Sequence, residues 1–274
     1  MSTRQQRERR LLVALGVSVL VLLSAAILVA NGQRAASTPV SAGIDANTVS
    51  RIDIVRPARA DITLERRRGD DWGIVAPCAL DAQNARIDPL LGALGAAALD
   101  YPAGEVDLEA AGLLEPLAEI RLDGAATLLG GTDLGDERRY ALTGNRVALV
   151  PEWTLSLVDG GLSALADPVP FPNAPTRLRR LDAGTAAAEP TASSSVDDAD
   201  PASWEGLAAS QIVTWPVPGA PATTRTAGYE ATFASGETRR YELVGNESWN
   251  ALRLEGNGCA WLFADDDLPP GAYP

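Results

Sequence analysis

The sequence predicts an α+β protein, built as an N-terminal transmembrane helix followed by a β-rich extracytoplasmic body of antiparallel meanders with a few helices. Three observations support this fold class. Residues 11–30 form an apolar run without a charged residue. Short stretches of alternating apolar and polar residues recur along the rest of the chain, as half-buried strands require. Apolar residues at helical spacing are confined to a few places in between.

The N-terminal segment has the features of a membrane anchor. Leu11–Ala30 matches a hydrocarbon core of about 30 Å, at about 1.5 Å rise per residue. Residues 1–10 contain four arginines and one glutamate, whereas only Arg34 follows the run closely. The positive-inside rule therefore predicts a cytoplasmic tail at 1–10, a single-pass helix in the inner (cytoplasmic) membrane and a periplasmic C-terminal body.

A cleavable signal peptide is the alternative, since Ser24, Ala25 and Ala26 provide the small residues of a cleavage site. The apolar run is longer than an ordinary signal-peptide core, so we favour the uncleaved anchor. Residues 31–48, with their serines, glycines and Pro39, then form a polar tether between the membrane and the folded body.

The composition excludes several classes of catalytic site. All 23 basic residues are arginine, and the chain contains neither lysine nor histidine. Histidine bases, Ser/His/Asp triads, histidine-ligated zinc, P-loop lysines and Schiff-base lysines are therefore impossible. The formal net charge is −13, and an acidic body repels nucleic acid. We expect no nucleic-acid partner.

The first folded part is predicted at residues 49–170. Three short antiparallel strands open it, at Ile52–Ile54, Ile62–Leu64 and Trp72–Val75. A helix follows, with Asp88 as its N-cap, Pro89 as its first residue and apolar positions continuing to Ala98.

Glycine-rich turns divide the rest of this part into further strands. They are predicted at Ile120–Leu122, Thr127–Leu129, Arg139–Thr143 and Val147–Val150. A short helical turn is expected at Asp107–Ala111 and a helix between Trp153 and Leu165. Gly130–Gly131 and Gly135 do not match the spacing of a dinucleotide-binding fingerprint, and we interpret them as loop glycines.

Residues 171–203 are predicted to be a linker, because they are rich in Pro, Ser, Ala and Asp and poor in large apolar residues. Residues 204–274 then form a second β-rich segment. Its strands are expected at Ile212–Trp215, Tyr229–Phe233, Arg239–Val244, Ala251–Leu254 and Cys259–Phe263. So few short strands are marginal alone, and this segment should pack on the first.

Two octapeptides echo each other: RRYALTGN at 138–145 and RRYELVGN at 239–246. We interpret both as strands of a β-rich protein rather than as two copies of a binding site. In the second, alternation places Tyr241 in the core and points Arg240 and Glu242 to solvent. The expected register pairs Ala231 with Tyr241 and Tyr229 with Leu243, around a loop centred on Gly236.

The order of these features resembles the bacterial family of unknown function DUF4340, over about residues 49–180. The shared features are a strand pair, a tryptophan-containing strand, Pro77, a helix with paired leucines, a Gly-Leu-x-x-Pro turn at Gly112–Pro116 and an Arg-Tyr strand before a valine-rich one. Members of that family are typically membrane-anchored and resemble proteins that accompany gliding-type ABC transporter auxiliary subunits. The resemblance implies envelope or ABC transporter partners and brings no catalytic residues.

Cys78 and Cys259 are the only two cysteines, and both belong to the body predicted to lie outside the cytoplasm, where disulfides persist. A bond between them would staple the two folded parts together. Two buried free thiols are the alternative.

We predict no catalytic, cofactor-binding or metal-binding residue. Asp265–Asp267 is expected to be a solvated cap, and the six tryptophans are interpreted as large core residues. The expected function is that of a non-enzymatic, membrane-anchored periplasmic subunit or scaffold. A periplasmic module that binds a small molecule, a glycan or a lipid is the alternative.

Overall fold

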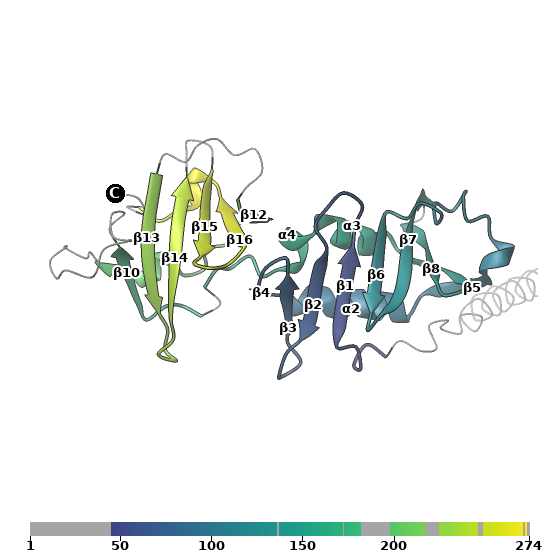
Figure 1. The fold of residues 1–274 in the computed structure, drawn as a ribbon, viewed down its shortest axis with the longest axis horizontal. Coiled ribbons are helices and arrows are strands. Elements are labelled where there is room, and N and C mark those ends of the chain that lie inside the picture. Colours follow the sequence, from purple (N-terminus) through teal and green to yellow (C-terminus); the bar gives the residue numbers. More distant parts are fainter. Residues whose placement is uncertain are drawn as a thin grey trace, which may run out of the picture.

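The computed structural model describes residues 45–135, 137–171, 173–181, 198–216, 225–245, 249–270 and 272. It shows a β-rich protein of two antiparallel sheets with few helices (Figure 1). The predicted cytoplasmic tail, the predicted membrane helix at 11–30 and the tether up to residue 44 lie outside the described residues. Within the described part of the chain, no helix is long and apolar enough to cross a membrane.

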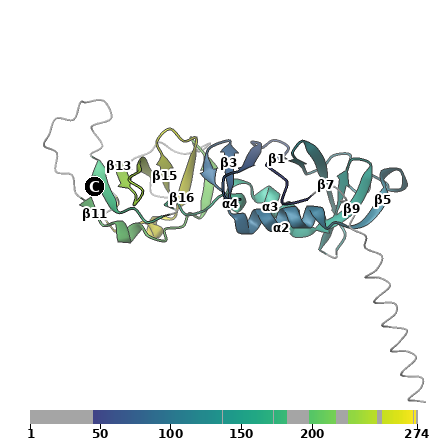
Figure 2. The same ribbon diagram turned by 90° about the horizontal axis from the view of Figure 1, so that it is seen from below.

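The first sheet has nine strands in the order β4-β3-β2-β1-β6-β7-β8-β9-β5. They are β1 (Arg51–Val55), β2 (Ile62–Arg66), β3 (Trp72–Ala76), β4 (Leu80–Asp81), β5 (Ala98–Pro102), β6 (Ala118–Leu122), β7 (Ala125–Asp133), β8 (Arg138–Thr143) and β9 (Arg146–Pro151). The helices α2 (Asn84–Gly95), α3 (Glu152–Gly160) and α4 (Leu162–Leu165) lie on one face of this sheet (Figure 2), and η1 (Ala103–Glu105) follows β5. The helix expected between Trp153 and Leu165 is thus divided at Gly161, whose φ of 63° is left-handed.

The second sheet has seven strands in the order β11-β10-β13-β14-β15-β16-β12. They are β10 (Arg177–Leu181), β11 (Asp198–Ala199), β12 (Gln211–Thr214), β13 (Arg225–Thr232), β14 (Thr238–Gly245), β15 (Asn250–Leu254) and β16 (Cys259–Phe263), with the 3-10 helices η2 (Pro201–Trp204) and η3 (Asp265–Asp267). We call the part from β1 to α4 the first half and the part from β10 to β16 the second half. The two halves lie side by side along the long axis of the molecule (Figure 1).

The core of the first half forms between the buried face of the first sheet and the buried stripe of α2. Ile52 and Ile54 of β1 are completely buried and pair across the sheet with residues of β2 and β6. The buried residues of α2 are Ile87, Leu90, Leu91 and Leu94, spaced so that they form one stripe. The helix therefore covers the sheet face that carries the alternating isoleucines.

The predicted ends of this helix are wrong. The helix begins at Asn84, whose Oδ1 accepts a hydrogen bond of 2.9 Å from the backbone N–H of Trp72 and so ties the helix start to β3. Pro89 lies in the middle of the helix, which has 12 residues, and its missing N–H removes a single intrahelical hydrogen bond. The helix ends at Gly95, and Ala98–Pro102 pairs with β9 as an edge strand.

The predicted linker at 171–203 is wrong at both of its ends. Arg177–Leu181 is strand β10, and Asp198–Ala199 is strand β11, while residues 182–197 lie outside the described residues. In β10 only Leu178 is buried, among three arginines, so the sequence shows almost no apolar alternation. Pairing with β13 makes it a strand, and the second sheet therefore begins at residue 177 rather than after 204.

Two glycines interpreted as loop residues lie inside a strand. Gly130 and Gly131 belong to β7, and the segment around Gly112 crosses them at close range. A Cβ on Gly130 would lie 2.4 Å from the backbone oxygen of Ala111, so a larger residue has no room there. Close backbone approach, rather than a turn, explains these glycines.

Replacing Gly130 by alanine should therefore destabilise the protein by about 1–3 kcal/mol, as overpacking does. Gly92 is a matched control, because it lies in α2 and a Cβ added there would meet nothing within 4 Å. There alanine should stabilise by about 0.5–1 kcal/mol, since it favours the helix. Urea unfolding of both variants measures the difference, and equal midpoints would refute the packing account.

The two halves share one strand topology. Seven neighbouring strands of the first sheet, β2-β1-β6-β7-β8-β9-β5, correspond in order and in chain sequence to β11-β10-β13-β14-β15-β16-β12 of the second. Each neighbouring pair is antiparallel in both sets. The first half adds β3, β4 and α2 at the point where the second half has η2. The body is therefore built from two copies of one arrangement.

The octapeptide echo does not mark equivalent strands. The first copy lies on β8 and the second on β14, which takes the place of β7 in the shared topology. Tyr241 is buried, as expected, and Arg240 is exposed. The expected register is wrong by two residues, since Tyr229 pairs with Tyr241. A shift of two leaves every side chain on its face, so alternation alone could not distinguish the two registers.

Candidate functional site

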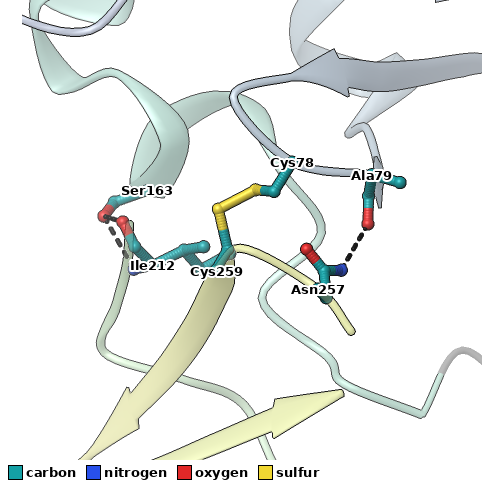
Figure 3. The surroundings of a disulfide bond; sticks show 6 residues. All are labelled: Cys78, Ala79, Ser163, Ile212, Asn257 and Cys259. Carbon is teal, nitrogen blue, oxygen red and sulfur yellow. Dashed lines mark hydrogen bonds between the residues drawn. A yellow bond between two sulfur atoms is a disulfide. The ribbon is translucent and has the colours of Figure 1, made fainter. Parts of the chain in front are cut away.

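The junction of the two halves holds the two cysteines. Cys78, between β3 and β4, is joined by a disulfide to Cys259, the first residue of β16 (Figure 3). Their Cα atoms are 5.9 Å apart, and 181 positions separate them in the sequence. Both side chains are buried. The disulfide therefore links the first sheet directly to the second.

Hydrogen bonds on both sides of the disulfide tie the halves further (Figure 3). The Ser163 hydroxyl of α4 accepts a bond of 2.9 Å from the N–H of Ile212 and donates to the oxygen of the same residue. It thereby satisfies backbone groups on the outer edge of β12, which would otherwise be open to pairing. The Asn257 side chain donates to the oxygen of Ala79 at 2.7 Å.

Hydrogen bonds also hold the segment that connects the two halves, which includes Asp167 and Pro170. The indole N–H of Trp261 donates to the oxygen of Asp167 at 3.2 Å, and the Tyr241 hydroxyl donates to the oxygen of Pro170 at 3.3 Å. Burial raises the pKa of Tyr241, so its hydroxyl stays protonated as a donor over the physiological range. One continuous apolar core runs through both halves. The junction is thus rigidly held.

A groove of about 750 Å³ lies at this junction. One wall comes from the first half and the other from the second, and the connecting segment forms the floor. The walls include Arg67, Asp81, Arg239 and Glu255, and the floor includes Val169 and Pro170. Its volume falls within the range of about 300–1,000 Å³ that is typical of ligand sites.

Ion pairs cover much of the groove wall. Arg67, in the turn after β2, crosses β3 and pairs with Asp81 of β4. Arg239 pairs with Glu237 at 2.7 Å. The hydrogen bond from Arg239 lowers the pKa of Glu237, and the same bond raises the pKa of Arg239. Both groups are therefore charged at neutral pH, and the groove presents a fixed pattern of charges rather than a titrating pair.

A second candidate surface lies at the end of the first sheet where β6 and β8 begin and β9 ends. We call Leu114, Leu117 and Trp153, together with the hollow beside them, the strand-end surface. These three residues are 63%, 48% and 41% exposed, and they are three of the five exposed large apolar residues in the described part of the chain. The hollow measures about 410 Å³ and lies between Leu117, the β1–β2 loop and the face of α3 that carries Leu155 and Ser156.

Arginines hold the elements around this hollow in place. Arg59 donates to the oxygen of Asp159 at 2.6 Å and forms an ion pair with its carboxylate, and Arg56 contacts the carbonyls at the same C-terminal end of α3. Cations are favourable there because they complement the helix dipole. Arg139 pairs with Glu152 at the other end of the helix. These groups fix α3 beside the exposed leucines.

Asp265–Asp267 forms η3. Among the described residues, no three His, Cys, Asp or Glu side chains are placed to hold a metal ion. Of the six tryptophans interpreted as core residues, Trp72, Trp204 and Trp261 are buried, Trp215 and Trp249 are half-buried, and Trp153 is exposed. The buried residues of α3 are Thr154, Leu155, Leu157 and Val158, and Trp153 is not among them. Helical spacing of the apolar residues could therefore have predicted that Trp153 is exposed, but the sequence analysis did not use it.

Comparison with known protein families, with curated proteins and with solved structures found no match to this chain. The resemblance to the DUF4340 family therefore stays a prediction.

Proposed function

We propose that the protein is a non-enzymatic, membrane-anchored periplasmic subunit or scaffold that docks on other proteins of the envelope, as an accessory component of an ABC-type transport or envelope system. The apolar run at 11–30 with its arginine-rich flank supports the anchor and its orientation. The disulfide supports a body outside the cytoplasm, since structural disulfides persist in oxidising compartments.

The strand-end surface is the observation that carries the docking role. Protein interfaces are enriched in Trp and Arg, and a few large anchors beside a pocket provide most of the binding energy. Trp153 is 41% exposed at the start of α3, and its neighbours along the helix, Leu155 and Ser156, line the hollow together with Leu117. Its exposure costs hydration free energy that a partner would recover by covering it.

Affinity purification from membranes in mild detergent tests this role. The wild-type chain should retain an envelope protein, and Trp153→Ala should reduce its affinity by about 30-fold or more, as expected for an anchor residue worth at least about 2 kcal/mol. The fold should be retained, because Trp153 is 41% exposed and lies outside the buried stripe of α3. Glu205→Ala, an exposed change in the second half, is the control and should leave recovery unchanged.

The groove favours a second candidate function, the binding of a small molecule, a glycan or a lipid, because of its size and its position between the halves. Native mass spectrometry of the purified full chain distinguishes the two functions. A stoichiometric small ligand without any co-purifying envelope protein would replace the docking proposal.

A further inference from the structure

We propose that the groove binds an extended segment of a partner protein through a lysine or arginine side chain, whose aliphatic stem lies on the groove floor and whose charged end meets Asp167 and Glu255. The proposal rests on the docking function and adds the chemistry of one part of the partner. It follows from the charge, the floor and the rigidity of the groove.

The charge balance of the lining favours a cation. Three arginines line the groove, and each has a carboxylate partner: Arg67 with Asp81, Arg239 with Glu237 and Arg240 with Glu230. Asp167 and Glu255 also line the groove, so five carboxylates and three guanidinium groups line it. Glu230 is shared between Arg240 and Arg179, which lies outside the lining, so the excess of negative charge rests on Asp167 and Glu255.

These two extra carboxylates have no cationic partner among the described residues. Asp167 accepts a hydrogen bond of 2.9 Å from the N–H of Val169, and Glu255 is an exposed residue of the turn between β15 and β16. An anionic ligand would meet uncompensated negative charge here. A cationic group would complete the pattern of ion pairs and would be steered towards an acidic chain.

The apolar part of the groove lining favours a cation that carries a long aliphatic stem. Apolar surface between the charged groups comes from Val169 and Pro170 on the floor and from Leu80 and Leu254 on the two walls. Lysine and arginine side chains place their methylene stems on apolar surface while the charged end reaches a polar rim. A metal ion or a small amine would leave this floor uncovered, whereas a long cationic side chain matches both parts of the groove.

The two walls are held at a fixed separation, which lowers the entropic cost of binding. The disulfide, the bond from Asn257 to Ala79 and the bond from Trp261 to Asp167 connect the wall of one half to the other half or to the floor. A binding site that needs no ordering loses less free energy on association. The groove is therefore pre-organised for an extended segment that lies across the junction.

The test uses the full-length protein in detergent and a fluorescein-labelled octapeptide of alternating Arg and Ala, compared with the same peptide carrying Gln in place of Arg. Fluorescence anisotropy should show binding of the Arg peptide only. Since an exposed ion pair contributes modestly, Glu255→Gln should weaken binding about 2- to 5-fold, and Glu255→Arg should weaken it by at least about 10-fold. Glu109→Arg, with the same charge change on an exposed residue outside the groove, should weaken binding less than about 2-fold.

Two results would overturn the proposal: wild-type affinity in both Glu255 variants, or an equal loss in Glu109→Arg, which would show that the peptide responds to net charge alone. Co-purification of the envelope partner is scored separately. A partner retained through Trp153 together with an insensitive groove would refute this inference and leave the docking function standing. If the Arg peptide binds but no envelope protein co-purifies, the docking function is refuted, and only the affinity of the groove for cationic side chains stands.

Discussion

Replacing Cys78 and Cys259 by alanine should lower the free energy of unfolding by about 5 kcal/mol, one of the largest effects expected for this protein. The disulfide closes a loop between residues 181 positions apart, so it removes much of the conformational freedom of the unfolded chain. It also joins the two sheets at the one junction that defines the groove. Removal of the disulfide should therefore destabilise both halves.

Urea unfolding followed by tryptophan fluorescence measures this effect. With a slope of about 2–3 kcal/mol per molar urea, the midpoint should fall by about 2 M in the double variant. Each single alanine variant should behave like the double variant, because either change removes the bond. If reduced and oxidised wild-type protein unfold at the same midpoint, the two cysteines are not paired in the folded protein.

Trp204→Ala should lower the free energy of unfolding by about 3–5 kcal/mol, as the loss of a large aromatic core residue does. Trp204 is 2% exposed, and its ring centroid lies 4.9 Å from that of Tyr229 and 6.0 Å from that of Phe171. The second half has η2 where the first half has the long helix α2. Trp204 therefore packs with Phe171 and Tyr229 in the part of the second half that corresponds in chain order to β3, β4 and α2 of the first.

Trp153→Ala provides the matched control, because it removes the same side chain from an exposed position. Its free energy of unfolding should stay within about 0.5 kcal/mol of the wild-type value. Thermal or urea unfolding of the two variants separates a core role from a surface role. Equal destabilisation by both changes would contradict the assignment of Trp153 to a docking surface.

Alternation in the sequence predicted most of the long strands, because one face of each is buried. It located β1 and β2 through their alternating apolar residues, while Trp72 and its apolar neighbours marked β3. It missed β4 and β11, which are two residues long and have no periodicity to detect. It also missed β10, whose strand conformation depends on pairing with β13 rather than on its own pattern.

Less of the candidate site than of the fold could be predicted from the sequence. The chain has only two cysteines, so a single pairing was possible, but whether the fold brings them within bonding distance depends on the junction. The groove joins Arg67, Asp167 and Glu255, which are far apart in the sequence and carry no motif. Only the arrangement of the two halves gives those residues a common surface.

Photocrosslinking in intact cells tests the docking function most directly. A benzoylphenylalanine at position 153 places the reactive group on the strand-end surface, and the same group at position 205 places it on an exposed part of the second half. We predict one discrete crosslinked product with an envelope protein from position 153 and none from position 205. The absence of any protein adduct at 153, in cells where the chain is anchored and folded, would contradict the account.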